Sequence, residues 1–178
     1  MNNSTEITTL DMGCGSAKQK NSLGLDIFKS PHVDVVANMN FPMPFKDESF
    51  HAIYMIDSLE HVEDVAKTLS EASRILKQSG VINVRTPHFS SLHAYSDFTH
   101  KQFFSVEGLK SLLEKNSSYQ GYGVNNLTLT HVRLKLWKAW RLLGVELFAN
   151  LFTQYYEKLF AFWFPAMCIE FSLTKETK

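Results

Sequence analysis

One short segment constrains the fold more than any other part of the chain. The apolar run at residues 7–12 is followed at once by Gly13-Cys14-Gly15, a pattern that indicates a strand ending in a glycine turn. Because glycine has no Cβ, another group can approach the main chain closely at such a turn. Turns of this kind lie at the carboxyl edge of open α/β sheets, where these sheets bind ligands. The segment therefore predicts a parallel sheet with a binding site beyond its first strand.

The rest of the chain continues this pattern, which is typical of the α/β class. Short apolar runs predict further strands at residues 23–27, 33–37, 52–56, 81–84, 127–134 and 167–173. The run at 52–56 is continuously apolar, which favours a parallel strand buried on both faces. Apolar residues at helical spacing predict a helix at 63–77 with Gly80 as its stop signal, and Ser105 is the expected N-cap of a helix that reaches about Asn116.

Length and composition narrow the protein class. The chain of 178 residues has no repeat or linker, so we expect a single domain over residues 1–178. Lys and Arg number 18, as do Asp and Glu, so the chain lacks the basic excess of nucleic-acid-binding domains and we expect no nucleic-acid partner. The two distant cysteines, Cys14 and Cys168, fit a reducing cytoplasm. We expect neither a signal peptide nor a membrane span.

An aromatic segment at about 136–165 differs from the rest of the chain. Its apolar residues follow a helical stripe: Phe148, Phe152, Tyr155, Leu159 and Phe162, with Trp137, Trp140 and Trp163 nearby. We expect this helical insertion to be buried, packed on the sheet or at a homodimer interface. A lid over the substrate and a weak contact with a membrane surface are the alternatives.

The residues beyond the first two strands predict a nucleoside site. Asp26 ends the second strand, where a carboxylate can accept hydrogen bonds from both hydroxyls of a ribose. A strand-end Asp that is merely solvated is the other interpretation. A dinucleotide fingerprint would need Gly or Ala at position 18, and Lys18 stands there, which disfavours a nicotinamide dehydrogenase.

Longer stretches of the chain resemble class I methyltransferases of type 11, which depend on S-adenosylmethionine (SAM). These stretches are residues 10–17, 24–27, 41–45, 47–50, 59–62 and 74–80. Residues 86–91 and 97–104 more narrowly resemble small bacterial methyltransferases found in cell-surface polysaccharide gene clusters. The resemblance is close over roughly residues 6–105 and looser beyond them.

The resemblance implies a Rossmann-like, seven-stranded, mostly parallel sheet with an antiparallel last strand and helices on both faces. The first crossover must be truncated, because the connection from Gly15 to Leu23 is shorter than the roughly 10–12 residues that a helical crossover needs. SAM is the implied cofactor. The residues implied to bind it are Asp11, Gly13 and Gly15 for the methionine and ribose part, Asp26 for the ribose hydroxyls, Asn38 and Met39 for the adenine, and Asp57 near the reacting methyl.

The expected chemistry is the alignment of a nucleophile with an electrophilic methyl group, helped by a base if the nucleophile is a hydroxyl. The predicted catalytic residues are His100, Asp97 and His88, since an Asp near a His can fix the imidazole tautomer. We expect a packing or capping role for His61. The histidines show no metal-binding spacing, so no metal is expected.

The expected function is therefore a SAM-dependent methyltransferase that acts on a small-molecule or glycan-like acceptor, with O-methylation as the expected reaction. N-methyltransferases of nucleic acids and of glutamine carry Asp/Asn-Pro-Pro-Tyr/Phe after the fourth strand. Here residues 56–59 read Ile-Asp-Ser-Leu, which argues against methylation of an amino group. The alternative is a non-catalytic module on the same fold that binds SAM, a nucleoside or a partner.

Overall fold

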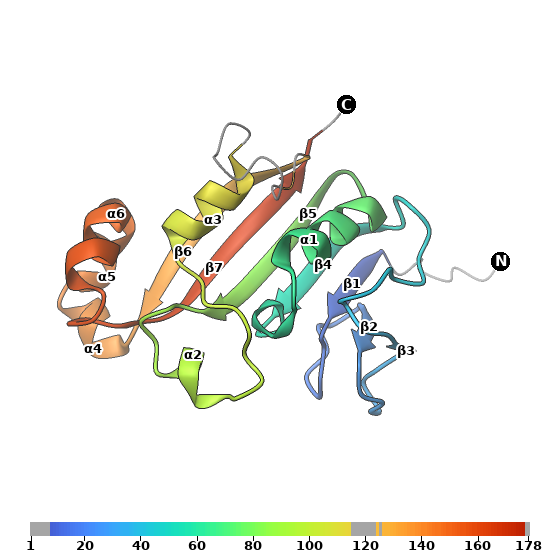
Figure 1. Ribbon diagram of the computed structural model, residues 1–178, viewed down its shortest axis with the longest axis horizontal. Helices are drawn as coiled ribbons and strands as arrows, with labels where there is room; N and C mark the ends of the chain where they lie inside the picture. The colour runs from blue at the N-terminus through green and yellow to red at the C-terminus, as the bar shows by residue number, and fades with distance from the viewer. Residues whose placement is uncertain (1–7, 115–123, 125, 177–178) are drawn as a thin grey trace.

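The computed structural model describes residues 8–114, 124 and 126–176, and its centre is a seven-stranded sheet (Figure 1). The strands are β1 (Thr9–Met12), β2 (Leu23–Asp26), β3 (Val35–Val36), β4 (Phe50–Ile56), β5 (Leu76–Pro87), β6 (Leu127–Leu136) and β7 (Ala166–Lys175). They lie in the order β3-β2-β1-β4-β5-β7-β6. Strands β1 to β5 pair in parallel, whereas β7 runs antiparallel to both β5 and β6. The predicted α/β class and the antiparallel last strand are confirmed.

The helical elements are η1 (Leu59–His61), α1 (Val65–Ile75), α2 (His93–Ser96), α3 (Val106–Leu113), α4 (Lys138–Leu142), α5 (Val145–Leu151), α6 (Thr153–Tyr155) and the π-helical turn η2 (Tyr156–Phe160). Helix α1 begins where the Asp64 carboxylate accepts a hydrogen bond from the Lys67 amide, and it buries Leu69 and Ala72. Helix α3 begins at Ser105, as predicted, because the Ser105 hydroxyl accepts a hydrogen bond from the Gly108 amide at 2.9 Å.

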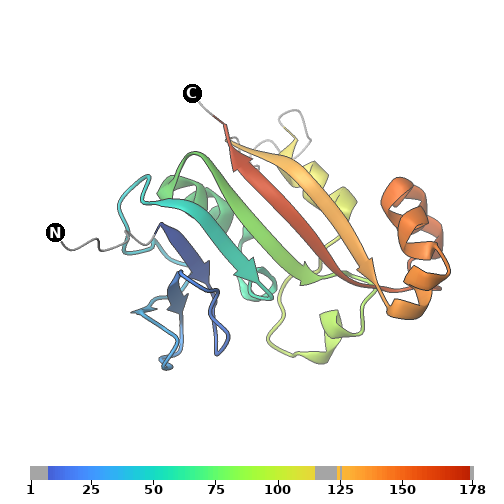
Figure 2. The ribbon, with the colours of Figure 1, turned by 180° about the vertical axis from the view of Figure 1, so that it is seen from behind.

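The helices are distributed differently from the expectation of two covered faces. Helices α1 and α3 cover one face, and α4 to α6 lie beyond the β6 edge, while the view from behind shows the other face with no helix across it (Figures 1 and 2). Within the described residues, the connections 13–22, 27–34 and 37–49 contain no helix. The first connection has ten residues, the lower limit of the roughly 10–12 that a helical crossover needs, and the second has eight, which is below that limit. The truncated first crossover is thus as predicted, and the second connection is truncated as well.

The uncovered face explains the burial pattern of the strands. Successive strand residues point to opposite faces of a sheet. In β4, Ile53 and Met55 are fully buried, whereas Ala52, Tyr54 and Ile56 between and beside them are only half-buried. The prediction that this strand is buried on both faces is therefore wrong, because its apolar run includes residues that face the uncovered side.

The expected helix stop at Gly80 is also corrected. Helix α1 ends at Ile75, and β5 begins at once with Leu76. Gly80 lies inside β5, next to Ser79 with a φ of +59°, where the pairing with β4 shifts its register. The helix stops early because Leu76 adopts an extended conformation. The predicted end of the second long helix near Asn116 lies outside the described residues.

Candidate functional site

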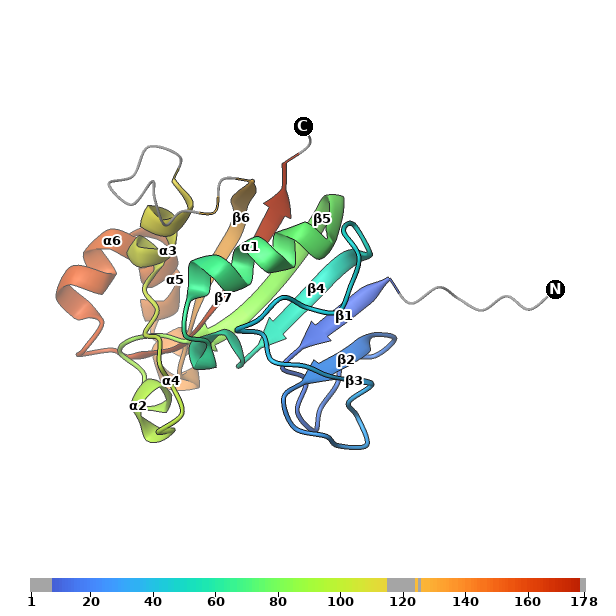
Figure 3. The same cartoon turned by 45° about the vertical axis from the view of Figure 1, so that its right-hand side comes forward.

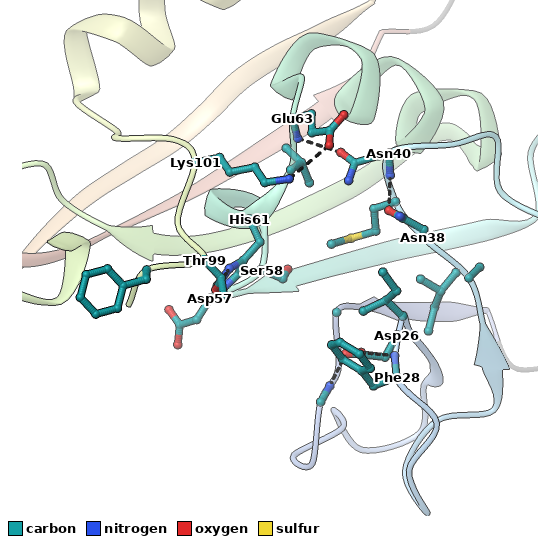
Figure 4. A pocket seen from close by; sticks show the side chains of 18 residues that line it. Asp26, Phe28, Asn38, Asn40, Asp57, Ser58, His61, Glu63, Thr99 and Lys101 are labelled. Carbon is teal, nitrogen blue, oxygen red and sulfur yellow. Dashed lines mark hydrogen bonds and ion pairs between the residues drawn. The ribbon is translucent and has the colours of Figure 1, made fainter. Parts of the chain in front are cut away.

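A cavity of about 650 Å³ lies beyond the carboxyl ends of β1, β2 and β4 (Figure 4). The chain leaves β1 toward β2 and β3 on one side, and later toward β4 and β5 on the other. Open α/β sheets bind ligands at such a switch point, and the volume is that of a small-molecule or cofactor site. The site thus lies where the glycine turn predicted it.

The two glycines of the turn have different roles. Gly13 has a φ of +74°, and a Cβ on it would overlap with the Cβ of Ser58. Ser58 in turn donates a hydrogen bond to the Met12 carbonyl at 2.8 Å, so β1 and the end of β4 are packed together here. Gly15 has a φ of +51°, lines the cavity, and a Cβ on it would have no neighbour within 4 Å. Gly13 is therefore needed by the fold, whereas Gly15 leaves open space for a ligand.

Asp26 stands at the rim of the cavity with a fixed carboxylate. Its Oδ2 accepts a hydrogen bond from the Gly15 amide at 2.9 Å, and its Oδ1 accepts one from the Phe28 amide at 3.0 Å (Figure 4). Each carboxylate oxygen keeps a further lone pair, so the group can also accept hydrogen bonds from ligand hydroxyls. This matches the predicted location of Asp26.

The residues after β3 form another wall. Asn38 and Met39 both line the cavity, as predicted. The Asn38 side-chain oxygen accepts a hydrogen bond from the Asn40 amide at 2.9 Å, which holds its amide group in place. Together with Leu25 and Ala37, Met39 makes this wall largely apolar, as a planar heterocycle requires.

Asp57 lies where β4 ends, with a strained backbone φ of +52°. Its amide donates a hydrogen bond to the Arg85 carbonyl at 2.8 Å, and its carboxylate accepts two from the Arg85 guanidinium. These hydrogen bonds raise the pKa of Arg85. Asp57 lines the cavity as predicted, but its carboxylate is engaged by Arg85.

Asp11 is not part of the cavity lining, which corrects its predicted contact with the ligand. Its side chain is buried, and its Oδ2 accepts a hydrogen bond from the Gln19 amide at 2.7 Å. Strand alternation turns Asp11 to the face opposite Leu10 and Met12. Burial raises the pKa of Asp11 despite this hydrogen bond. Asp11 therefore stabilises the short connection between β1 and β2.

Comparisons with known proteins agree with this architecture. Residues 10–84 match the family model described as a methyltransferase domain. An uncharacterized protein of Methanocaldococcus jannaschii is 33% identical over 66% of this chain, and the chain spans 60% of that protein's length. A SAM-dependent methyltransferase from Archaeoglobus fulgidus aligns with a TM-score of 0.60 and 19% identity, over 96% of this chain and 88% of that one. One from Mesorhizobium loti aligns with a TM-score of 0.60 and 15% identity, over 96% and 93%.

The chain has the fold of class I SAM-dependent methyltransferases. Both of these structural neighbours are named as SAM-dependent methyltransferases.

The three predicted catalytic residues do not lie together in the structure. His88 is fully buried outside the cavity lining, with Nδ1 beside the Ser90 hydroxyl and Nε2 beside the Glu157 carboxylate. His100 is also outside the lining, and its Nδ1 lies 3.0 Å from the Ala94 carbonyl. Asp97 is exposed and does not contact either histidine ring through a hydrogen bond in the described structure.

His61 is the histidine that lines the cavity. Its Nδ1 lies 2.9 Å from the Thr99 hydroxyl (Figure 4). That hydroxyl donates a hydrogen bond to Asp97 Oδ1 at 2.7 Å. Because the Thr99 proton goes to Asp97, Nδ1 of His61 must be the donor to Thr99, and Nε2 of the neutral ring is left as an acceptor. The hydrogen bonds from Thr99 lower the pKa of Asp97. Sequence reasoning expected only a packing or capping role for His61; its place at the end of η1, in the segment that follows β4, was the available signal.

A second arrangement around His61 bears on metal binding. Ligand atoms of Glu60, His61 and His100 lie within 4.8 Å of one another. His100 Nε2 and Glu60 Oε1 lie 3.9 Å apart. Glu60 Oε1 has no hydrogen-bond partner among the described residues, and burial raises the pKa of Glu60, which moves the carboxyl toward its neutral form. The three groups therefore lie together, and the expectation that no metal binds stays a prediction.

Proposed function

We propose that this protein is a SAM-dependent methyltransferase that methylates a hydroxyl group of a small-molecule or glycan-like acceptor. The observation that carries the proposal is the open space over Gly15 beside the fixed carboxylate of Asp26, at the switch point of the sheet. In this proposal, Asp26 binds the ribose hydroxyls, and Asn38 and Met39 contact the adenine. The methionine part follows Gly13 and Gly15, which directs the reactive end toward the Asp57 side of the cavity.

The proposed mechanism assigns the general base to His61. When bound, SAM supplies an electrophilic methyl group. His61 Nε2 would take the proton of the acceptor hydroxyl while the oxygen–methyl bond forms and the methyl–sulfur bond breaks, with S-adenosylhomocysteine as the leaving group. Thr99 and Asp97 would hold the ring in the tautomer that this needs. Val62 and Phe98 contribute apolar side chains to the cavity lining; Val62 is buried and Phe98 is fully exposed.

Two features favour oxygen as the acceptor atom. A hydroxyl must lose its proton during transfer, and the free Nε2 of His61 can take it. Residues 56–59 lack the Asp/Asn-Pro-Pro-Tyr/Phe motif of enzymes that methylate planar bases or amides. A glycan is favoured among hydroxyl acceptors because residues 86–91 and 97–104 resemble enzymes of surface-polysaccharide gene clusters.

The function is tested by calorimetry with SAM and S-adenosylhomocysteine, followed by a screen of sugar-nucleotide and lipid-linked glycan acceptors for methyl transfer. We expect binding of both nucleosides and transfer to a hydroxyl. Binding without transfer to any hydroxyl acceptor would favour the non-catalytic module, and absence of binding would reject the cofactor assignment.

Replacing Asp26 with Ala is expected to weaken SAM binding roughly tenfold to hundredfold, the effect of losing about 1.5–3 kcal/mol of hydrogen bonding to a charged group. Calorimetry measures this loss. Asp34→Ala is the matched control, because the Asp34 carboxylate also accepts a backbone hydrogen bond, from Gly24 at 2.7 Å, but lies outside the cavity lining. Equal SAM affinity in Asp26→Ala and the parent protein would show that the ribose lies elsewhere.

Replacing Gly15 with Ala is expected to leave the protein folded but to weaken SAM binding at least tenfold, because the added methyl group occupies the ligand space. The positive φ costs about 1–2 kcal/mol of stability. Gly144→Ala has the same backbone strain, with a φ of +79° and no neighbour within 4 Å, far from the cavity. Thermal melting should thus change similarly in both variants, and only Gly15→Ala should lose affinity. A loss of affinity in both would point to a general structural effect.

A further inference from the structure

The aromatic segment, residues 137–163, has the opposite orientation to the one its sequence predicts. The stripe expected to be buried is exposed: Phe148 by 37%, Phe152 by 52%, Tyr155 by 62%, Leu159 by 63% and Phe162 by 74%. The prediction that this stripe packs against the domain is therefore wrong. Helices α4 to α6 project beyond β6, away from the rest of the sheet (Figures 1 and 3).

Inward-facing polar side chains help to hold the aromatic segment to the domain, beside the buried side chains of Ala149, Tyr156 and Ala161. The Glu146 carboxylate accepts hydrogen bonds from the Leu136 amide at 3.0 Å and from Arg133 at 3.1 Å. The Asn150 side chain bonds to both the amide and the carbonyl of Leu134, at 2.8 and 2.9 Å. A helix of a water-soluble protein normally turns its polar side outward. Here Glu146 and Asn150 face the domain instead.

Glu157 completes this attachment from the other end of the aromatic segment. Its carboxylate accepts hydrogen bonds from the amides of Val106 and Glu107 at the start of α3, at 2.6 and 3.2 Å, and lies 3.2 Å from His88 Nε2. Since Glu146, Asn150 and Glu157 all face inward, the outer surface carries large apolar side chains and cations but no acidic side chain of the segment.

The exposed apolar surface is extensive. The large side chains of the aromatic segment that are more than half exposed are Trp137, Leu142, Leu143, Leu147, Leu151, Phe152, Tyr155, Leu159, Phe162 and Trp163. Monomeric soluble proteins rarely expose contiguous apolar patches of more than a few hundred Å², and larger ones mark protein or membrane contacts. A surface of this kind needs a partner.

The charges of the aromatic segment indicate which partner fits. Its cations, Lys138, Arg141 and Lys158, are all exposed, whereas its two acidic residues, Glu146 and Glu157, are turned inward. A symmetric contact with a second copy would bring together two copies of the same positively charged surface. An anionic lipid surface supplies the complementary charge, and Trp and Tyr side chains are favoured at that depth of a bilayer.

We propose that the aromatic segment docks this protein on the surface of an anionic lipid bilayer. Its exposed Trp, Phe and Leu side chains enter the boundary between headgroups and acyl chains, and Lys138, Arg141 and Lys158 contact the headgroups. Within residues 8–114 and 126–176, no helix is long and apolar enough to cross a membrane. The proposal concerns contact with the surface alone and is independent of the proposed enzymatic function.

The test is co-flotation of the full chain with vesicles of phosphatidylcholine containing phosphatidylglycerol, and with vesicles of phosphatidylcholine alone. We expect strong flotation with the anionic vesicles and at least tenfold less with the neutral ones. Two triple variants should each bind the anionic vesicles at least tenfold less than the parent protein. The apolar triple variant combines Leu147→Ser, Leu151→Ser and Phe162→Ser. The cationic triple variant combines Lys138→Gln, Arg141→Gln and Lys158→Gln.

The matched control replaces exposed apolar residues outside the aromatic segment, Val36→Ser with Phe41→Ser, and should float like the parent protein. All replaced side chains are exposed, and thermal melting confirms that the variants fold. Absence of flotation, or unchanged flotation of the apolar triple variant, overturns the proposal. A dimer in sedimentation that dissociates in that variant, without any vesicle binding, would show that the partner is a second copy.

Discussion

Replacing His61 with Gln is expected to slow methyl transfer about 10²–10⁴-fold while leaving SAM affinity nearly unchanged. The expected size is that of a positioned general base. Glutamine fills a similar volume and can still bond to Thr99, but it cannot take a proton at neutral pH. Single-turnover rates measure the chemical step, and calorimetry measures cofactor binding separately.

His100 provides the decisive comparison for this result. It is the histidine that the sequence pattern favours, yet its ring bonds to the Ala94 carbonyl and lies outside the cavity lining. We therefore expect His100→Gln to affect the rate much less than His61→Gln. A larger effect at His100, or an unchanged rate at His61, would remove His61 from the mechanism. His93→Gln, on α2 and also outside the lining, serves as a control for loss of a histidine.

Replacing Glu157 with Ala is expected to lower the free energy of unfolding by about 3–5 kcal/mol, the usual effect of removing one partner from a buried pair. The side chain is 7% exposed, and its loss leaves His88 and the first amides of α3 without their acceptor. Urea unfolding measures the change. Lys158→Ala changes the next residue, whose side chain is exposed, and should have little effect.

The contribution of Glu157 should also depend on pH. Burial by itself raises the pKa of Glu157, but hydrogen bonds from His88, Val106 and Glu107 outweigh it and bring the pKa below its ordinary value. A carboxyl whose pKa is lowered by folding stabilises the protein above its unfolded pKa, and loses this effect as the pH falls through the folded pKa. The stability difference between the parent and Glu157→Ala should therefore shrink in acid. A difference that stays constant from neutral to acidic pH would contradict the assigned contacts.

The parts of the fold that follow from local patterns could be predicted. The strand with its glycine turn, the carboxylate at position 26 and the helix start at Ser105 all depend on residues close in the chain. The sheet face without helices could be predicted only in part. A short connection excludes a crossover helix, but an apolar run such as residues 52–56 does not show which face of the sheet the helices cover.

The choice of histidine and the orientation of the aromatic segment could not be predicted, because both depend on distant partners. The tautomer of His61 is set by Thr99, which is 38 positions away in the chain. Helical periodicity locates an apolar stripe but does not state which side the domain occupies. The side that faces the domain is fixed by Glu146, Asn150 and Glu157, which bond to backbone groups of other elements.

The bonds from Asn150 to Leu134 also bear on how the molecule avoids aggregation. A strand at the rim of a sheet exposes amides and carbonyls that can recruit a strand from another chain. Strand β6 is at one rim, and helix α5 occupies these groups at Leu134 and Leu136. The opposite rim is β3, which is only two residues long and offers a poor template for growth. The carboxyl-terminal part of β6 and the short β3 are thus poor templates for strand-to-strand polymerisation.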